Sequence, residues 1–535
     1  MKSLLPKHLE LLATKEGGGE NPTVLLFGKL VHSRYDPLTE ARNMIASKDL
    51  LSCQMVVLFG AGLGYVVRAI FEKNPKIRVF IIEKEEYFAH YIKEKIPAGD
   101  LTIMVNKSAE EIISYLSSQV VISSLKNVAF LDNKTLTQYY NDYFEKIKKE
   151  IIEFFKRQVA QISTDAYFSR LWLNNIFKNI RDIDDFSFIN DLKDRFKGES
   201  CLLLSGGPSL ENNIGWIQKS KIYKLALAGA AGLLLKNHIK VDFIIASDAG
   251  FFNIYHFKKY LRNRDLVLFT DLSLHPSILS QWKGRTYFYD HKLPPTGFLT
   301  DLTGPIGYIP MSGTISTCAL FLLQFLGFTR VFLAGQDFGY PDLKTHCRGS
   351  GYESFYITRI NKKKTIMNHY YETVKRNQTF LRPDGFYTDS KMVMYQKWLE
   401  KIAKGLKIKM KNLSHSGIKG IEKGSEKEIM ALKANTISFS AVSRKIRSRV
   451  KKGSITMIEK LKVLKKDIEG LKRSPNRSRL EKVLTRDKMI FQLLEMVMYL
   501  DFLKLKRNMQ DIDGPFLEKV IRGTEEIEEL FRYLI

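Results

Sequence analysis

The sequence contains few cysteines, and their positions exclude one common kind of site. Four cysteines stand far apart in 535 residues, at Cys53, Cys201, Cys318 and Cys347. They form no C-x-x-C pair, and no histidine cluster has the spacing of zinc ligands. We therefore expect a protein of a reducing compartment that holds no structural zinc of this kind.

Long apolar runs are also missing. The two longest, at residues 225–235 and 318–328, are about half of the ~20 residues that a membrane span needs. The N-terminal stretch MKSLLPKHLELLATKEGGGE lacks the apolar core of a signal peptide. We expect a cytoplasmic protein with no membrane span.

Negative charge is in deficit, because the formal net charge is +27. Such a balance points to an acidic or phosphorylated partner, and a nucleic acid, a nucleotide sugar, an acidic sugar or a membrane surface would each fit. The aromatic pair of an RRM and the GXXG clamp are absent, which argues against a nucleic-acid partner. The length predicts three or four domains.

The N-terminal region carries a glycine-rich loop between two strand-like runs. A buried strand at 55–59 leads into Gly60-Ala-Gly-Leu-Gly64, and the next strand ends at Glu83. This acid lies 23 positions after Gly60 (83 − 60), close to the ~20 of a dinucleotide or S-adenosyl fingerprint. The pattern predicts a Rossmann-like domain over 1–140. Because no methyl-transfer or hydride-transfer residues follow, we favour a structural domain over a working cofactor site.

Three further regions follow along the chain. Residues 141–198 read as a helical linker, and residues 199–420 alternate strands with helices, as in a mostly parallel α/β sheet with its site at the carboxyl ends of the strands. Residues 421–535 read as a helical bundle, because apolar residues recur at 4-3-4-3 spacing from Met457 to Leu471. The predicted strands of the sheet are 201–204, 224–228, 243–247, 266–270, 286–289 and 331–334.

Two loops of the predicted sheet have the composition of anion-binding loops. The strand at 201–204 runs into Gly206-Gly207-Pro208-Ser209, whose glycines permit close approach of the backbone to a ligand. An ordinary strand-to-helix turn explains this loop equally well. The second loop ends in Ser312-Gly313-Thr314 before an apolar helix, and its hydroxyls and amides suit an anionic or sugar group. A plain N-cap is the alternative there.

The third motif has the composition of an active-site rim. The buried strand at 331–334 ends in a polar cluster, which a short basic loop with a histidine follows. Carboxylate, amide, phenol and imidazole within eleven residues are poorly explained by packing. The side chains concerned are Gln336, Asp337, Tyr340, Lys344, Thr345 and His346.

Taken in order, these motifs carry a family resemblance. The GGPSL loop, the SGT helix start, GQDFGY and KTHCRG resemble the central domain of motility-associated (Maf-type) flagellin glycosyltransferases. The stretch SGTISTCALFLLQFLGFTRVFLAGQDF is also similar to bacterial sialyltransferases that use CMP-sialic acid. The resemblance covers roughly residues 20–425, and HSRYDPLTEA, FGAGLGY and TDAYFSRLWLNNIFKNI look like the family's N-terminal and linker regions.

The resemblance implies an α/β enzyme with a sialyltransferase-like central domain. It would move a nonulosonic acid from its CMP-activated form onto Ser or Thr hydroxyls of flagellin, with no metal and no cofactor required. Asp248, at a strand end, would orient ribose or acceptor, and a helix N-cap is its alternative role. The residues that would hold the nucleotide sugar are Gly206, Gly207, Pro208, Ser209, Asp248, Ser312, Gly313, Thr314, Gln336, Tyr340, Lys344 and Thr345.

The general base does not follow directly from the resemblance. Sialyltransferases place a histidine before a helix that resembles the one here after 388, but residues 382–387 contain none. His346 is our candidate base, because an imidazole titrates near neutrality, and Asp337 is the second catalytic candidate. His369 and Asp384 are the alternatives.

Two other functions compete with glycosyl transfer. The central domain also resembles an archaeal pterin pyrophosphokinase group, which would use ATP and magnesium. The chain would otherwise be a basic protein that binds flagellin or RNA without chemistry. A net charge of +11 (14 − 3) over residues 441–480 predicts that the C-terminal helices recruit the acidic protein acceptor.

Overall fold

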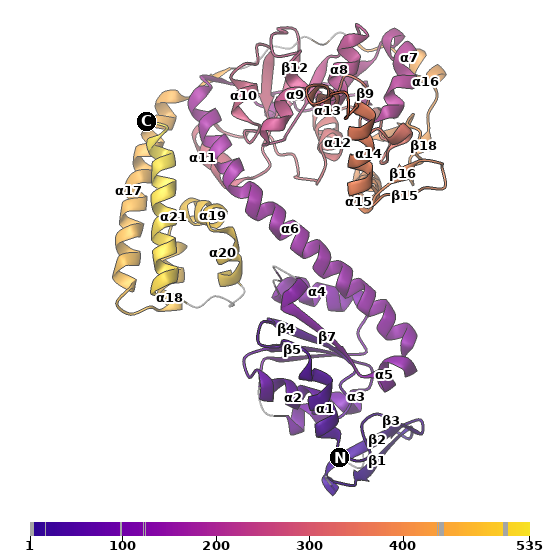
Figure 1. Cartoon of the computed structure of the whole chain (residues 1–535). Helices are drawn as coiled ribbons and strands as arrows, with labels where there is room; N and C mark the ends of the chain where they lie inside the picture. Colours follow the sequence, from indigo (N-terminus) through magenta and orange to yellow (C-terminus); the bar gives the residue numbers. More distant parts are fainter. Residues whose placement is uncertain are drawn as a thin grey trace. The chain divides into compact units, whose positions relative to one another are not determined.

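The computed structural model describes residues 5–16, 18–96, 99–120, 122, 125–435, 437, 443–506 and 512–535. Within it the chain forms two compact units (Figure 1). The first comprises residues 1–167 with 499–511, and the second 168–498 with 512–535. The long helix α6 (Asn141–Asp182) supplies residues to both. The predicted α/β fold class with a C-terminal helical region is confirmed, whereas the division into four domains stays a prediction.

The first unit contains a Rossmann-like parallel sheet. The glycine-rich loop follows β4 directly, and Glu83 is the last residue of β5, as predicted. All five residues of β4 are buried, as befits a central strand covered on both faces. The strands, in spatial order, are β6 (Leu101–Val105), β5 (Arg78–Glu83), β4 (Met55–Phe59) and β7 (Val128–Asp132).

A small antiparallel sheet precedes this domain in the same unit. In it, Leu9 pairs with Leu26 in a hairpin for which the sequence analysis predicted no strands. Its strands are β1 (Leu9–Thr14), β2 (Gly18–Leu26) and β3 (Lys29–Leu30). The helices of the first unit are α1 (Pro37–Ala46), α2 (Tyr65–Lys73), α3 (Glu86–Lys95), α4 (Ala109–Gln119), η2 (Leu125–Asn127), α5 (Lys134–Tyr139) and α20 (Tyr499–Lys506).

The second unit is built on an eight-stranded parallel sheet. From β9 the chain moves outward strand by strand to β13, and it then returns to place β14 on the other side of β9. Such a reversal opens a crevice at the carboxyl ends of the two strands, where doubly wound sheets bind ligands. The spatial order is β13 (Arg285–Phe288), β12 (Val267–Thr270), β11 (Phe243–Ile245), β10 (Tyr223–Leu227), β9 (Ser200–Leu204), β14 (Arg330–Ala334), β17 (Lys409–Asn412) and β18 (Glu422–Lys423).

Helices cover both faces of this sheet. Leu203 and its neighbours on alternate positions pack toward α12, whereas Leu202 and Leu204 pack toward α7 and α8. The helices of this region are η3 (Ile189–Leu192), η4 (Pro208–Asn213), α7 (Ile214–Lys219), α8 (Ala228–Lys236), η5 (Phe251–Asn253), α9 (Ile254–Phe257), α10 (Pro276–Leu279), α11 (Pro294–Thr303), α12 (Ile315–Leu326), η6 (Pro341–Leu343), α13 (Gly351–Ile357), α14 (Ile366–Arg376), α15 (Ser390–Gly405) and α16 (Glu426–Met430). Short strand pairs are β15 (Phe380–Leu381) with β16 (Tyr387–Thr388), and β8 (Asp185–Phe186) with β19 (Arg444–Lys445).

Except for α20, the C-terminal helices belong to the second unit. In α17, the predicted 4-3-4-3 seam from Met457 to Leu471 is buried at every position, and α17 and α21 lie side by side (Figure 1). Phe531 of α21 packs against Phe298 of α11, so the bundle contributes to the core of this unit. The helices are α17 (Arg447–Leu471), α18 (Arg477–Leu484), α19 (Lys488–Val497) and α21 (Gly514–Arg532). Within the described ranges, every helix is too short or too polar to cross a membrane.

Candidate functional site

Two predicted motif loops meet at the reversal point between β9 and β14. The Gly207 amide donates to the Gly335 carbonyl at 3.0 Å. A Cβ on Gly207 would lie 2.3 Å from that carbonyl oxygen and 2.5 Å from Oδ2 of Asp337. The missing side chain at Gly207 therefore admits the neighbouring loop of the protein itself, and ligand binding by this loop stays a prediction.

Asp337 fastens the same two loops. Its Oδ2 accepts a hydrogen bond from the Ser209 amide at 2.8 Å, and its Oδ1 accepts one from the Ser209 hydroxyl. The residue is 3% exposed. Burial raises the pKa of this carboxyl, and the hydrogen bonds from Ser209 oppose the rise. Both oxygens are engaged at the start of η4, where Pro208 is the first residue, so this geometry gives Asp337 a structural role.

Gln336 forms hydrogen bonds to three segments, which are the end of β9, helix α12 and the loop after β17. Its side-chain amide donates to the hydroxyl of Ser205 after β9 and, at 2.8 Å, to that of Ser316 in α12. Its backbone amide donates to Ser414 Oγ at 2.7 Å, and its carbonyl accepts from Ser416 Oγ at 2.7 Å. The Ser414 and Ser416 contacts were not predicted, although they lie in the NLSHSG stretch after β17.

Tyr340 also acts as a structural fastener. Its hydroxyl donates to Oδ2 of Asp389 at 2.5 Å and accepts from Nδ2 of Asn377 at 3.0 Å. Asp389 is the N-cap of α15, so the phenol holds the start of that helix. Burial and the Asp389 carboxylate raise the pKa of Tyr340.

The SGT motif forms the helix start that its plainer alternative predicted. Thr314 is the N-cap of α12 and accepts from the Thr317 amide at 3.3 Å. The Ser312 hydroxyl donates to that of Thr317 at 2.8 Å. Gly313 has a positive φ of 75°, and a Cβ on it would lie 2.2 Å from the Trp398 ring. Glycine is therefore required at 313 by the backbone and by this contact.

The KTHCRG loop is held against α8 and the GGPSL loop. The Cys347 amide donates to the Gly206 carbonyl at 2.8 Å. Lys344 Nζ and Arg348 Nε lie 3.6 Å and 3.3 Å from the same Glu211 oxygen, so the predicted cation Lys344 already has a carboxylate partner. A Cβ on Gly232 of α8 would lie 1.8 Å from the Gly349 carbonyl oxygen, which shows how closely the loop approaches.

His346 lies in an aromatic and poorly hydrated setting. Its ring stacks on Tyr352 with centroids 4.4 Å apart, and the His256 ring lies at 6.4 Å. Burial, with a smaller contribution from His256, lowers the pKa of His346 to about 3. A general base works best with a pKa near the working pH, so this imidazole is neutral but weakly basic. Its Nδ1 and the Thr345 hydroxyl are buried with no hydrogen-bond partner among the described residues.

The amino end of α8 lies beside this histidine. Leu227, its N-cap, provides no side-chain hydrogen bond to the first amides. A Cβ on Gly229 would lie 3.6 Å from Cδ2 of His346 and 3.8 Å from Cε1 of His256, which is ordinary van der Waals contact. Gly229 and His256 were not predicted as site residues. Uncapped amides at a helix N-terminus bind anions, so Gly229 marks the best candidate place for a phosphate.

The remaining predicted residues lie on other loops. Asp248 follows β11, is exposed and accepts from the Gly250 amide at 2.8 Å. Gly250 is the N-cap of the next helix, so the idea that Asp248 caps it is wrong. His369 of α14 stacks on Tyr356 at 5.1 Å. Asp384 is exposed and pairs with Arg382 at 2.9 Å.

The glycine-rich loop of the first unit is occupied by the protein's own side chains. Oε2 of Glu83 accepts from the amides of Ala61 at 2.7 Å and Gly62 at 3.2 Å, and His32 Nε2 accepts from the Leu63 amide at 2.9 Å. Burial raises the pKa of Glu83 to about 7 and lowers that of His32 to about 3. A phosphate would need these amides, so the geometry favours a structural domain.

Two cavities include none of the predicted site residues. One of about 310 Å³ lies between the end of α6, α10 and β13 in the second unit. The other, of about 110 Å³, lies beside His32 in the first unit. In the part of the chain that the structure describes, no three His, Cys, Asp or Glu side chains are grouped to hold a metal ion. Independence from metals stays a prediction.

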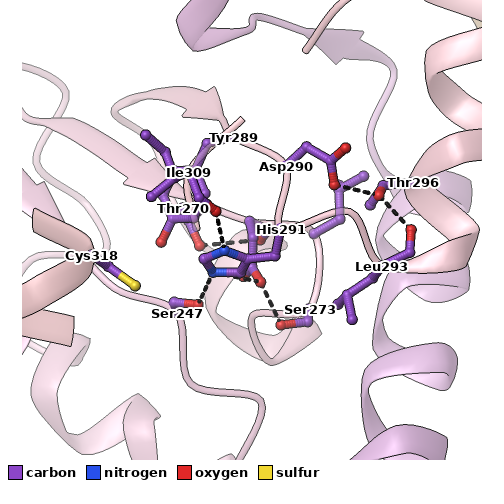
Figure 2. A network of polar contacts seen from close by, with 12 residues as sticks. Ser247, Thr270, Ser273, Tyr289, Asp290, His291, Leu293, Thr296, Ile309 and Cys318 are labelled. Carbon is purple, nitrogen blue, oxygen red and sulfur yellow. Dashed lines mark hydrogen bonds and ion pairs between the residues drawn. The ribbon is translucent and has the colours of Figure 1, made fainter. Parts of the chain in front are cut away.

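A second polar cluster at the same sheet edge was missed by the sequence analysis. His291, after β13, has its Nδ1 2.7 Å from the Ile309 carbonyl and its Nε2 3.2 Å from the Ser247 hydroxyl (Figure 2). Oδ2 of Asp271, after β12, lies 3.7 Å from the same Nε2. The available signal was that all three side chains follow predicted strands of one parallel sheet.

The chain is similar to known proteins in fold and, over part of its length, in sequence. A solved Maf glycosyltransferase from Magnetospirillum magneticum AMB-1 matches 99% of this chain and 94% of its own, with a TM-score of 0.61 and 14% identity. The chain has the fold of a Maf glycosyltransferase. The family described as 6-hydroxymethylpterin diphosphokinase MptE-like matches residues 174–343. An uncharacterised protein of Treponema pallidum (strain Nichols) is 24% identical over 228 residues, 40% of this chain and 74% of that protein.

Proposed function

We propose that this protein is a Maf-type glycosyltransferase that moves a nonulosonic acid from a CMP donor onto Ser or Thr hydroxyls of flagellin. The observation that carries the proposal is the convergence of the GGPSL loop, the start of α8 and the KTHCRG loop at the sheet reversal point. The fold, shared with a Maf glycosyltransferase over 99% of the chain, supports the same activity.

The donor phosphate would bind at the amino end of α8. The amides there lack a side-chain cap, and Gly229 places this helix start beside the rings of His346 and His256. The Nδ1 of His346 and the hydroxyl of Thr345 lack partners among the described residues, so they are available to a ribose or phosphate oxygen. We therefore assign these two side chains to donor binding, and His346 no longer serves as the preferred base.

The transfer needs charge stabilisation at the leaving group. As the bond between the anomeric carbon and the CMP phosphate breaks, negative charge grows on the phosphate oxygen. Fixed amide dipoles aimed at that position stabilise the charge without reorganisation. The acceptor hydroxyl forms the new bond to the anomeric carbon and loses its proton to a base.

The acceptor would meet the basic surface of the C-terminal helices. Of the 14 Lys and Arg in residues 441–480, six pair with carboxylates of the second unit, so the concentrated charge is partly neutralised. Exposed lysines of α17, such as Lys462 and Lys466, have no ion pair in the described residues and remain for an acidic partner.

The test combines two measurements on the purified chain. Incubation with CMP-pseudaminic or CMP-legionaminic acid and flagellin should release CMP and increase the intact mass of flagellin by sugar-sized steps. Calorimetry should show binding of CMP and none of ATP. Flagellin of unchanged mass that still binds the chain would support a carrier protein and refute the proposal.

The diphosphotransferase alternative is set aside, because the MptE-like match covers residues 174–343 alone, whereas the likeness to a Maf glycosyltransferase extends over 99% of the chain. Release of AMP from ATP, with a hydroxymethylpterin and magnesium present, would contradict this choice.

A further inference from the structure

Three neighbouring strands of the second unit each end in a polar side chain of one cluster. Ser247, Asp271 and His291 follow β11, β12 and β13, which are parallel and adjacent, so their carboxyl ends share one edge. Figure 2 shows the imidazole between the Ser247 hydroxyl and the Ile309 backbone. The side chains of His291 and Asp271 are 2% and 3% exposed, whereas Ser247 is only partly buried.

The partners of His291 fix its tautomer. A carbonyl oxygen only accepts, so Nδ1, at 2.7 Å from the Ile309 oxygen, carries a hydrogen. The neutral ring then presents the lone pair of Nε2 to the Ser247 hydroxyl at 3.2 Å. A hydroxyl that donates to an oriented imidazole is the usual arrangement for proton removal from an oxygen.

Asp271 completes the cluster on the side of Nε2. Its Oδ2 accepts from Ser273 Oγ at 2.7 Å and lies 3.7 Å from Nε2, so a proton gained there would face a carboxylate. Its Oδ1 is buried with no hydrogen-bond partner in the described ranges. The other titratable neighbours are Tyr289, whose ring lies at 5.1 Å, and Cys318 of α12; burial raises the pKa of both, which keeps them neutral.

We infer that Ser247 is a catalytic residue of the proposed transfer and that His291, backed by Asp271, accepts the proton of the acceptor hydroxyl through it. This inference rests on the proposed function. The acceptor hydroxyl gives its proton to Ser247 Oγ while the Ser247 proton passes to Nε2 of His291. The acceptor oxygen bonds to the anomeric carbon, and the CMP phosphate leaves with the electron pair of the broken bond. The proton then leaves His291 by the same path to water.

The cluster is joined to the predicted donor loops. The Ile309 carbonyl that holds His291 stands three residues before Ser312, and Ser312 Oγ lies 3.4 Å from the Cys318 sulfur. Ser247 follows β11, and α8, whose amino end would hold the donor phosphate, follows the adjacent strand β10. Neighbouring strands lie ~4.8 Å apart, so the two strand ends place an acceptor beside the donor phosphate.

The test is the pH dependence of transfer by Ser247→Ala, His291→Asn and Asp271→Asn. Rates at saturating CMP-nonulosonate and flagellin are measured from about pH 5.5 to 9, with CMP affinity by calorimetry and thermal unfolding on the same samples. Thr296→Val is the matched control. It removes a hydroxyl that donates a hydrogen bond to Asp290 in the same region and has no hydrogen bond to His291 in Figure 2. His346→Asn tests the rival base.

We expect Ser247→Ala and His291→Asn each to lower kcat by ~10²–10³-fold with CMP affinity unchanged. The double variant should be no slower, because the two act as one unit. Asp271→Asn should move the acid limb of the rate profile to lower pH, since the protonated imidazole loses its carboxylate partner, and a merely structural role would leave that limb in place. Thr296→Val should stay within about threefold of wild type.

Two results would overturn the inference. If Ser247→Ala keeps a near-wild-type kcat, Ser247 takes no part in the reaction. This substitution removes one hydroxyl at a partly exposed position, so the test holds even where His291→Asn unfolds. If the Ser247 and His291 variants lose CMP binding as well as kcat, the cluster has a structural role and not a catalytic one. If the wild type transfers no sugar at all, the proposed function fails and the relay with it.

Discussion

The sharpest test of the donor site is a single methyl group at Gly229. In Gly229→Ala the new Cβ would lie 3.6 Å from Cδ2 of His346 and 3.8 Å from Cε1 of His256, so the folded protein accommodates it. Alanine also favours a helix over glycine by ~0.5–1 kcal/mol. We therefore expect thermal stability that is unchanged or slightly raised.

The same methyl group occupies the space through which a phosphate would reach the α8 amides. Forcing extra volume into a fitted contact costs ~1–3 kcal/mol. At ~1.4 kcal/mol per tenfold change, CMP should bind about 5- to 150-fold more weakly to Gly229→Ala. Gly229→Val should bind it more weakly still.

Gly207→Ala is the matched contrast. Its Cβ would lie 2.3 Å from the Gly335 carbonyl oxygen, a backbone atom that cannot move alone, so the cost falls on folding. A loss of ~1–3 kcal/mol should lower Tm by several degrees. Calorimetric titration with CMP and thermal unfolding of both variants decide the matter. Wild-type CMP affinity in Gly229→Ala, or weakened CMP binding without loss of Tm in Gly207→Ala, would return the phosphate to the GGPSL loop.

Three further predictions concern the rest of the chain. Burial raises the pKa of Glu83 from about 4.5 to about 7, so the stabilisation from its protonated form is present below pH 4.5 and is lost as the pH rises through 7. Denaturant unfolding at several pH values should show that the free energy of unfolding falls by ~3 kcal/mol over this range. Glu83→Gln should lack this pH dependence. Asn175→Ala leaves two buried carbonyls unpaired, those of Ala249 and Ser273, and should lower the free energy of unfolding by ~2–4 kcal/mol. Thermal unfolding measures this loss, and CMP titration of the same variant checks that the donor site is intact. The charge reversals Lys462→Glu and Lys466→Glu should weaken flagellin pull-down, most at low salt, while leaving CMP affinity intact.

These charge reversals test acceptor binding more directly than a deletion of the C-terminal helices would. Phe531 is fully buried against Phe177 and Phe298, so removing residues 436–535 would expose the core of the second unit. Exposing buried aromatic surface destabilises a unit by several kcal/mol, and CMP binding would then be lost for reasons unrelated to the acceptor.

The sheet of the second unit was predictable because its strands are short apolar runs bounded by glycine or polar residues. The run 201–204 and the run 331–334 both appear as adjacent central strands, β9 and β14. The hairpin of β1 and β2 was not predictable in this way. Its strand β2 opens with GGENP, which has the composition of a loop, and cross-strand pairing with β1 holds it in place.

The candidate site was only partly predictable, because polar residues at strand ends either bind a ligand or hold neighbouring loops of the protein together. The motif residues Asp337, Gln336 and Tyr340 were chosen for their chemistry, and each is saturated by hydrogen bonds to its own protein. Gly229 was not predicted because its stretch, residues 226–232, contains no polar side chain, yet it stands in the first turn of α8 beside His346. Tertiary contacts decide this distinction, and a single sequence contains no record of them.

Buried polar atoms without a partner support the two proposed sites. Leaving such an atom unpaired costs ~1–3 kcal/mol, which a ligand or a proton at the site would offset. Nδ1 of His346 and the Thr345 hydroxyl lack partners among the described residues beside α8, and Oδ1 of Asp271 lacks one beside His291. The first two atoms lie where we propose that the nucleotide binds, and the third lies beside the proposed base. The proposed donor site and the proposed base, at neighbouring strand ends, are the two parts that glycosyl transfer requires.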